Sequence, residues 1–314
     1  MGRITFLGNF SVDYSSETHH ANTLVALGWE VIRLQETEAS GEDILECALT
    51  SDAFVWIHTH MWQTPGLDMG EVLKELKKNN IPTLTYHLDL WFGLDREKDL
   101  ETDPFYKQIE YFFATDKLMC DWFNKETDVK GVYLPAGVYE PETEMVSGLK
   151  VHDVIFVGSK GYHKEWPYRP KLINWLQETY GDRFGHYSGE EEAIGLKRGK
   201  DLNQLYADSK VVVGDSLCLN FNYPHYWSDR VTETLGRGGF LIMPYIEGLN
   251  DYYEDGKHLV NYEFNDFDQL KFLIDYYLIN DKEREAIRKA GHEHVKKNHT
   301  YTNRWQFILK EIGL

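Results

Sequence analysis

The 314-residue chain contains few cysteines and no long apolar run. Its three cysteines, Cys47, Cys120 and Cys218, lie far apart and form no C-x-x-C pair, so neither a disulfide scaffold nor a thiolate metal site is expected. No stretch reaches the roughly 18 apolar residues of a membrane-spanning helix. The N-terminal MGRITFLGNF leads straight into a predicted strand and lacks the apolar region of a secretory signal. These features predict a cytoplasmic protein without a membrane span.

Positive charge is also scarce. The 33 Lys and Arg residues are outnumbered by 51 Asp and Glu residues, which gives a formal net charge of -18. Binding of duplex DNA over a large surface requires a basic footprint, so this balance weighs against it and leaves open only a local basic patch. Attraction to an anionic membrane surface is disfavoured for the same reason.

Two nucleotide-binding motifs are missing. The chain has no G-x-G-x-x-G, which argues against a nicotinamide-dependent oxidoreductase, and no G-x-x-x-x-G-K-[ST], which argues against a P-loop enzyme. His58 and His60 alternate at a predicted strand end and invite a metal-site interpretation, but no further ligand lies at suitable spacing. We therefore expect no catalytic metal and no cofactor.

What the sequence does contain is a repeated alternation of apolar strands and amphipathic helices. Such alternation is typical of parallel sheets covered by helices on both faces. A polar, irregular stretch at 138–152 separates two such series. We therefore predict an α/β protein with two doubly wound, Rossmann-like domains at 1–140 and 151–300, facing each other across a cleft. The last helix, 301–314, is expected to pack back on the first domain, and ligands are expected at the carboxyl ends of the strands.

The stretch 222–244, NYPHYWSDRVTETLGRGGFLIMP, holds the most informative residues. Ser228 or Asp229 can begin a short helix whose first turn carries Arg230, a residue that can bind an anion bidentately. Glu233 lies one turn further on the same face, where a carboxylate suits the two hydroxyls of a ribose. This arrangement fits a nucleoside diphosphate site. The alternative interpretation is an ordinary i,i+3 salt bridge on the surface.

SDRVTETLGRGGFLIMP, the following GKHLVNY and the late HTYTNR together resemble the C-terminal half of two-domain glycosyltransferases with the GT-B fold. The nearest resemblance is to the CgeB-like (spore-maturation type) group related to glycosyltransferase family 4. It extends over nearly the whole chain, through FVWIHTH, LTYHLDLWF, YLPAGVYEP and DLNQLYADSKVVVGDS. The resemblance implies transfer of a sugar from a nucleoside diphosphate sugar to a hydroxyl acceptor. It further implies retention of the anomeric configuration, and the chain has no D-x-D motif of the metal-dependent transferases.

The resemblance also implies a set of donor-binding residues. Glu233 matches the second of two family glutamates and would bind the ribose, whereas His225 stands where the first glutamate is expected, so the chain departs from the family at that position. The loop covering the diphosphate matches Tyr226, Trp227 and Ser228. Basic residues on the donor phosphates would be Lys160, Lys164 and Arg169, although a solvated basic loop is the alternative. Gly8 and Asn9 are placed near the phosphates by fold position alone.

In the first domain, the resemblance places His87 and Asp89 near the reacting centre, where they would orient the sugar or fix the acceptor hydroxyl. The alternative for His87 is a histidine that only completes a strand end. Two other functions remain open: a non-catalytic nucleotide-sugar binding protein with the same fold, or a virus-type transferase acting on a modified DNA base. The partner is a nucleotide sugar, and the sequence specifies neither the donor sugar nor the acceptor, which can be a glycan, a small molecule or a DNA base.

Overall fold

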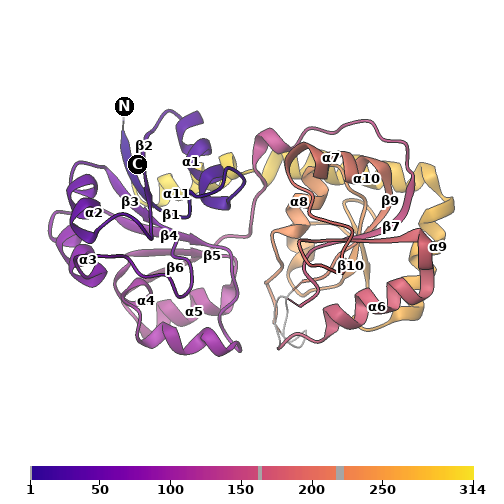
Figure 1. Cartoon of the computed structure of the whole chain (residues 1–314), viewed down its shortest axis with the longest axis horizontal. Helices are drawn as coiled ribbons and strands as arrows, with labels where there is room; N and C mark the ends of the chain where they lie inside the picture. Colours follow the sequence, from indigo (N-terminus) through magenta and orange to yellow (C-terminus); the bar gives the residue numbers. More distant parts are fainter. Residues whose placement is uncertain (1, 162–164, 217–222) are drawn as a thin grey trace. The chain divides into compact units, whose positions relative to one another are not determined.

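The computed structural model describes residues 2–161, 165–216 and 223–314. Lys164 and Cys218 lie outside the described residues. The chain forms two compact units (Figure 1). The N-terminal unit comprises Met1–Pro135 and Tyr301–Leu314, and the C-terminal unit comprises Ala136–Thr300. Each unit is an α/β structure built on its own parallel sheet.

The sheet of the N-terminal unit has six parallel strands in the order β2-β1-β3-β4-β5-β6. Its central strands β3 and β4 are buried along their whole length, and β3 is a continuous apolar run, as expected for strands buried on both faces. All four residues of β3 are buried, for example. The order reverses between β1 and β3, which is the point where ligands of such sheets bind. The strands are β1 (Arg3–Gly8), β2 (Glu30–Gln35), β3 (Ala53–Trp56), β4 (Thr83–His87), β5 (Tyr111–Ala114) and β6 (Lys130–Tyr133).

Most helices of this unit begin at an Asp or Ser that caps the first turn. Ser40 forms a capping box with Asp43, and Asp68, Asp103 and Asp116 each accept a hydrogen bond from a backbone N–H of the first turn. The helices are α1 (Ser16–Ala26), α2 (Gly41–Ala48), α3 (Met69–Lys78), the 3-10 helix η1 (Asp95–Glu101), α4 (Pro104–Gln108) and α5 (Lys117–Glu126).

The C-terminal helix α11 (Tyr301–Glu311) belongs to the N-terminal unit. Its Trp305 is fully buried and donates from Nε1 to Nδ1 of His20 on α1 at 3.1 Å. Burial lowers the pKa of His20 to about 3, so its ring is neutral and accepts this bond. The two ends of the chain therefore fold into one unit (Figure 1).

The C-terminal unit has five strands in the order β11-β10-β9-β7-β8, all parallel. Here the order reverses between β7 and β9. The strands are β7 (His152–Val157), β8 (Phe184–Tyr187), β9 (Ser209–Val213), β10 (Leu241–Pro244) and β11 (Val260–Tyr262). The helices are η2 (Glu140–Glu142), α6 (Tyr168–Tyr180), η3 (Gly181–Arg183), α7 (Gly199–Asp208), α8 (Arg230–Gly236), η4 (Leu249–Asp251), α9 (Phe267–Ile279) and α10 (Asp281–Asn298).

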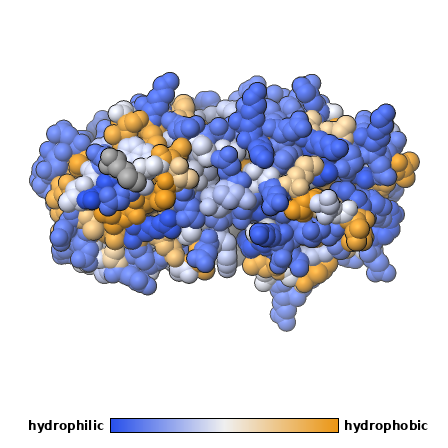
Figure 2. Space-filling model, turned by 90° about the horizontal axis from the view of Figure 1, so that it is seen from above, coloured by the Kyte–Doolittle hydropathy of each residue, from blue (hydrophilic) through white to orange (hydrophobic). Residues whose placement is uncertain are grey.

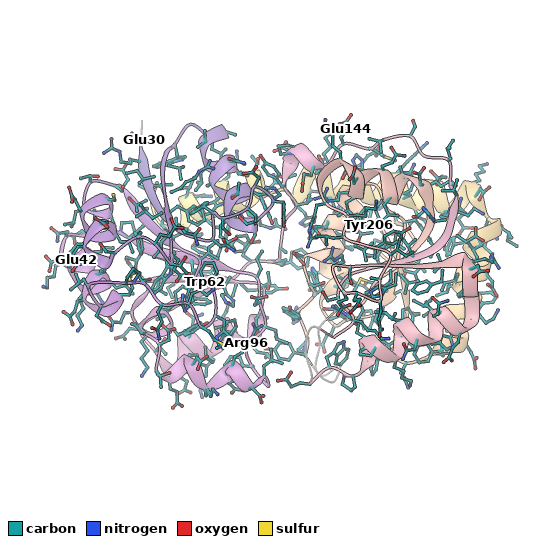
Figure 3. All side chains as sticks on the ribbon, viewed as in Figure 1. Glu30, Glu42, Trp62, Arg96, Glu144 and Tyr206 are labelled. Carbon is teal, nitrogen blue, oxygen red and sulfur yellow. The ribbon has the colours of Figure 1, made fainter. Side chains whose placement is uncertain are left out.

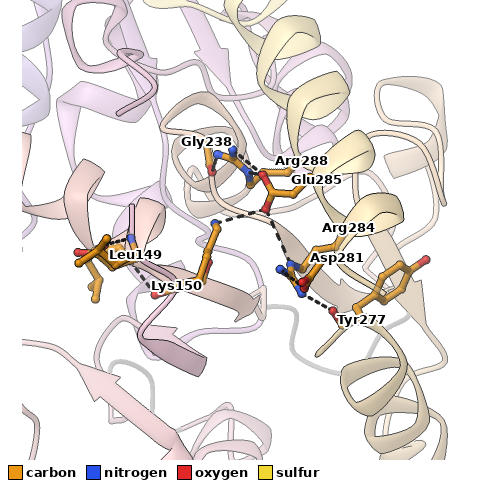
Figure 4. Close-up of polar contacts among 11 residues, drawn as sticks. Leu149, Lys150, Gly238, Tyr277, Asp281, Arg284, Glu285 and Arg288 are labelled. Carbon is orange, nitrogen blue, oxygen red and sulfur yellow. Dashed lines mark hydrogen bonds and ion pairs between the residues drawn. The ribbon is translucent and has the colours of Figure 1, made fainter. Parts of the chain in front are cut away.

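The stretch expected to be a free polar linker packs instead against the C-terminal unit. Asn203 donates from Nδ2 to the carbonyl oxygens of Glu142 and Glu144 at 2.9 and 3.0 Å. Further along, Lys150 lies 3.5 Å from a carboxylate oxygen of Glu285, which also binds Arg288 of α10 at 2.7 Å (Figure 4). Because these partners are far apart in sequence, the local polar composition gave no sign of the packing.

The face shown in Figure 2 is largely hydrophilic, with apolar residues in separate patches. Within the described ranges, no helix combines the length and the apolar character needed to cross a bilayer. The two parallel sheets with their helices confirm the predicted α/β class with two Rossmann-like domains.

Candidate functional site

Most of the residues predicted for the donor site lie in the C-terminal unit, where a row of alternating charges runs along α8. Arg230 Nη1 is 3.1 Å from Oε2 of Glu233, and Nη2 of Arg237 is 3.8 Å from Oε1 of the same carboxylate. Arg237 is almost fully buried and also binds the carboxylate of Glu142. Glu233 is thus held between two guanidinium groups, while 21% of its side chain stays exposed.

The spacing of Arg230 and Glu233 does form the salt bridge that the sequence left as an alternative. Apart from this ion pair, Nη1 of Arg230 makes no hydrogen bond within the described residues, and the atom is shielded from solvent. The contact of Arg230 with a donor phosphate therefore stays a prediction. Burial lowers the pKa of Arg230, but the negative charges of Glu233 and Asp229 outweigh it and hold the pKa above its usual value. The guanidinium group of Arg230 is therefore charged at every working pH.

The loop ahead of α8 is packed tightly. Tyr226 and Trp227 are each only 2% exposed, and the backbone N–H of Ser228 donates to Oγ of Ser216 at 3.2 Å. The helix begins after Asp229, whose side chain makes no capping bond. The two aromatic side chains are therefore buried, and the contact of this loop with a diphosphate stays a prediction.

His225, at the position of the missing glutamate, has a structural role in this loop. Its backbone has a φ of 56° and its N–H donates to the carbonyl of Glu247 at 2.8 Å. The imidazole covers Gly248, where an added Cβ would lie 2.1 Å from Nδ1. A glycine is required there for two reasons, this close approach and a φ of 87°.

Arg169 ties together the carboxyl ends of β7 and β9, at the reversal point of the sheet. It donates from Nε to Oδ2 of Asp215 at 3.0 Å and from Nη1 to the carbonyl of Ser159 at 3.3 Å. Trp166 donates to the same Asp215 oxygen at 3.1 Å. Burial raises the pKa of Asp215, opposed by the charge of Arg169 and by these bonds. The guanidinium is thus already engaged, and its contact with a donor phosphate stays a prediction.

Lys160 lies in the loop after β7. Its backbone N–H and that of Gly161 donate to the carboxylate of Glu190 at 2.7 and 3.1 Å, and its Nζ lies 3.8 Å from Glu192. A carboxylate therefore already occupies this pair of amides. The role of Lys160 in donor binding stays a prediction, and Lys164 lies outside the described residues.

In the N-terminal unit, Gly8 ends β1 and Asn9 follows it, at the carboxyl edge of the sheet. A Cβ at Gly8 would lie 2.9 Å from Cγ of Glu17, so the glycine allows α1 to approach closely. Oδ1 of Asn9 accepts from the N–H and the hydroxyl of Ser11 at 3.2 and 2.6 Å. The asparagine thus stabilises its own turn, and its role toward phosphate is untested.

His87 ends β4 and Asp89 lies just after it, but the two side chains differ sharply in exposure. His87 is only 3% exposed and lies among aromatic rings, 4.7 Å from the ring of Trp91. Burial lowers its pKa to about 4, so it is neutral at pH 7. Asp89 is half exposed, with an oxygen 4.0 Å from Nη1 of Arg96. Their catalytic roles stay predictions, and the burial of His87 restricts it to the neutral form.

Sequence reasoning missed a buried cluster at the same edge. His58 contacts Glu36 through Nδ1 and lies 3.3 Å from Oδ2 of Asp103 through Nε2. Glu36 is fully buried and also accepts from Nε1 of Trp56 at 2.9 Å and from the N–H of Thr59 at 3.0 Å. Burial lowers the pKa of His58, but hydrogen bonds and charge from Asp103 and Glu36 raise it to about 9.

The only sequence signal for this cluster was the position of Glu36 and His58 just after β2 and β3, the two strands that flank β1. Nearby, Nδ1 of His60 lies 3.2 Å from Oδ2 of Asp99. Among the described residues, no group of three or more His, Cys, Asp and Glu side chains has the arrangement of a metal site.

Known structures share this fold over essentially their whole length. HepE from Anabaena, in complex with UDP-glucose, is 11% identical, with 99% of each chain covered and a TM-score of 0.69. An alpha-glucosyltransferase in complex with UDP-glucose and DNA containing an abasic site is 11% identical, with 100% of each chain covered and a TM-score of 0.72. Sucrose-phosphate synthase from Thermosynechococcus elongatus is 11% identical, with 99% of each chain covered and a TM-score of 0.64. At these identities the similarity establishes the fold, which is the predicted GT-B architecture of two Rossmann-like domains.

No curated protein matches the sequence. The sequence model of one family does, over residues 149–310, which include nearly all of the C-terminal unit and the charged row on α8. That family is described as glycosyl transferase-like. The match spans just over half of the chain, and we conclude that the protein belongs to the glycosyl transferase-like family.

Proposed function

We propose that the protein transfers a sugar from a nucleoside diphosphate sugar to a hydroxyl group. The family assignment and the GT-B fold support this function. Two of the structures that share the fold contain UDP-glucose, so UDP-glucose is the first donor to test. We further propose the CgeB-like group, related to glycosyltransferase family 4, as the nearest part of the family, on the residues of the resemblance described above.

The observation that carries this proposal is the position of Glu233. Its carboxylate is fixed by Arg230 and Arg237, so it needs no ordering when a ligand arrives, and part of it is open to solvent. A carboxylate held in this way accepts hydrogen bonds from the two hydroxyls of a ribose at little entropic cost. We therefore assign the ribose to Glu233 and the diphosphate to Arg230.

The chemistry requires stabilisation of negative charge on the leaving phosphate. A guanidinium group can supply this stabilisation without a metal ion, and removing one such donor typically costs about 100- to 1,000-fold in rate. We propose a metal-independent, retaining transfer in which Arg230 has this role. The loop of Tyr226, Trp227 and Ser228 covers the diphosphate, Lys160, Lys164 and Arg169 add positive charge, and Gly8 and Asn9 approach it by backbone.

On the acceptor side, we propose that Asp89 fixes a hydroxyl and that neutral His87 orients the sugar or supports that region. We also propose a cytoplasmic location, which the free thiols of Cys47 and Cys120 support.

The test is donor binding to Glu233 variants. Thermal shift and calorimetry with UDP-, GDP-, ADP- and CMP-sugars should identify one donor, because ligand at a hundredfold excess over Kd stabilises the native state by about 2.7 kcal/mol. Glu233→Ala and the isosteric Glu233→Gln should then weaken that donor about 10- to 100-fold, the loss expected for hydrogen bonds to a charged group.

The matched control is Glu254→Gln, because Glu254 and Lys257 form an exposed i,i+3 ion pair at 2.7 Å in the same unit. Its donor affinity should stay unchanged. If both Glu233 variants fold and keep wild-type donor affinity, the ribose assignment is wrong. If no nucleotide sugar of the panel stabilises the wild type, the proposed function is wrong.

A further inference from the structure

The N-terminal unit contains a cavity that the donor assignment does not use. It has a volume of about 690 Å³, within the range of small-molecule sites. Its walls come from the chain after β3 and from the segment around η1 and the start of α4. It lies at the carboxyl edge of the sheet, where ligands of such folds bind. A smaller cavity of about 340 Å³ in the same unit lies at the opposite edge of the sheet. It lies beside Thr83, the first residue of β4, and Glu110, the residue before β5.

The charged groups of the larger cavity are rigidly held. His58 and Asp103 both line it, and His58 is fixed on its far side by fully buried Glu36. Asp103 also caps α4 through its second oxygen, which accepts from the N–H of Phe105 at 2.9 Å. The aspartate therefore cannot rotate away, and 26% of its side chain remains open to the cavity side and solvent.

The lining favours hydroxyl groups over anions. The lining contains three aspartates, Asp68, Asp99 and Asp103, and two histidines. None of the described lining residues is Lys or Arg. A phosphate or carboxylate placed here would meet more negative than positive charge without a guanidinium or ammonium to bind it. Carboxylate oxygens accept hydrogen bonds from hydroxyls, so the same walls suit a polyhydroxylated molecule.

Aromatic surface is available as well. Trp56 and Trp62 line the cavity, and Trp62, which is labelled in Figure 3, is half-buried. The C–H faces of sugar rings are apolar and pack on such rings, while their hydroxyls reach outward to polar partners. A half-buried tryptophan beside fixed carboxylates is thus a combination suited to a sugar ring.

We propose that this cavity binds the acceptor of the transferase, a polyhydroxylated molecule such as a sugar residue without phosphate or carboxylate groups. Asp99 and Asp103 accept its hydroxyl hydrogens and Trp62 packs on its apolar face. His58 is a positioning residue that orients Asp103. The role of the bound molecule as acceptor rests on the proposed function. Binding of neutral sugars by the cavity can be tested without a donor.

The direct test is ¹⁹F NMR of the full chain labelled with 5-fluorotryptophan. The Trp62 resonance is identified by its loss in Trp62→Phe. Glucose, mannose, galactose and trehalose are titrated to about 50 mM, each beside its matched sugar phosphate. We expect at least one neutral sugar to shift the Trp62 resonance, and its phosphate to bind about tenfold more weakly or not at all. The proposal is overturned if no neutral sugar shifts this resonance, or if the phosphates bind as well.

Variants separate binding from folding. Asp103→Asn keeps an oxygen to cap α4 but removes the charge, and should weaken the sugar about tenfold or more. The control is Asp128→Asn, which changes an exposed carboxylate at the smaller cavity and should change nothing. Equal affinity in both variants would also overturn the proposal.

The role of His58 has its own readout. Around it lie Glu36 after β2, Asp103 before α4 and neutral His87 at the end of β4, with the His60–Asp99 pair nearby. When His58 loses its proton at alkaline pH, it no longer holds ionised Asp103 in place. Wild-type affinity for the sugar should therefore fall as the pH rises through about 9, and this fall should be absent in His58→Gln. An identical pH profile in both proteins would exclude the positioning role.

Failure of the cavity assignment can be distinguished from failure of the proposed transferase function. Nucleotide-sugar binding is measured separately through Glu233. If neutral sugars bind at Trp62 while no donor binds, the cavity assignment stands and the transferase proposal fails. If a donor binds and no neutral sugar reaches Trp62, the transferase proposal stands and the cavity assignment fails.

Discussion

The protonation of His58 offers the sharpest quantitative prediction from the structure. The side chain of His58 is only 7% exposed, and its imidazole lies between Asp103 and the fully buried Glu36. These carboxylates raise its pKa from the ordinary 6.5 to about 9 against the effect of burial. We expect Glu36→Gln to bring this pKa back toward 6.5, because it removes a full negative charge while keeping an acceptor for Trp56.

The sign and size of the effect on stability follow from the two pKa values. Because the folded state holds the proton more tightly than the unfolded state, His58 stabilises the fold fully below pH 6.5, and this contribution is lost as the pH rises through about 9. The difference between the two values, at about 1.36 kcal/mol per pKa unit, corresponds to roughly 3 kcal/mol. This is a substantial part of the usual stability of a domain.

Two measurements check this prediction. NMR titration of ¹³C-labelled histidines between pH 5 and 10, with His58→Gln to assign the resonance, gives the pKa itself. Urea unfolding at pH 6.5 and 9.5, followed by the fluorotryptophan resonances of the N-terminal unit, gives the free energy difference between wild type and His58→Gln. A wild-type pKa of 6.5 or below would refute the reasoning, since it would mean that Glu36 and Asp103 do not outweigh burial.

Two further variants test buried groups elsewhere. Burial lowers the pKa of His87 to about 4, so its contribution is complete above pH 6.5 and is lost as the pH falls through about 4; His87→Phe should flatten this acid loss in urea unfolding, and an unchanged acid limb would show that the ring is not buried in the neutral form. Arg237→Met should destabilise the C-terminal unit by about 3 kcal/mol in thermal unfolding, because it removes the buried guanidinium that binds Glu142 and one of the two that flank Glu233, whereas the control Arg183→Met at a more exposed pair with Asp153 should cost under about 1 kcal/mol. Equal losses in the two arginine variants would contradict the central role of Arg237.

The fold was predictable from sequence because its signal is local. Strands buried on both faces read as apolar runs, and amphipathic helices with Asp or Ser at their starts separate them, so the α/β alternation shows without any knowledge of contacts. Two features were not visible in this way. Strand β11 has only three residues, and the stretch around Glu142 is fixed by partners such as Arg237, 95 positions away.

The candidate site was predictable only in part, for a related reason. The spacing of Arg230 and Glu233 shows that they share a helix face, but spacing cannot tell a structural ion pair from a ligand site. Here the ion pair forms, and the role of the two residues in donor binding stays a prediction. Arg169 looked like a free basic residue, because its partner Asp215 comes from another strand end. Glu36 stands among polar residues in the sequence, and its full burial follows only from the packing of the chain after β3 around it.

If the proposed cavity is the acceptor site, its charge distribution favours one of the acceptors that the sequence left open. A transferase whose acceptor is a base in DNA has to bind phosphates on either side of that base, and phosphate binding requires Lys and Arg near the acceptor position. The cavity at the carboxyl edge of the N-terminal unit has three aspartates and, among its described residues, neither Lys nor Arg. The DNA-containing alpha-glucosyltransferase shares the fold at 11% identity, which does not transfer its acceptor. In a chain of net charge -18, these walls favour a neutral acceptor that reaches them through hydroxyl groups.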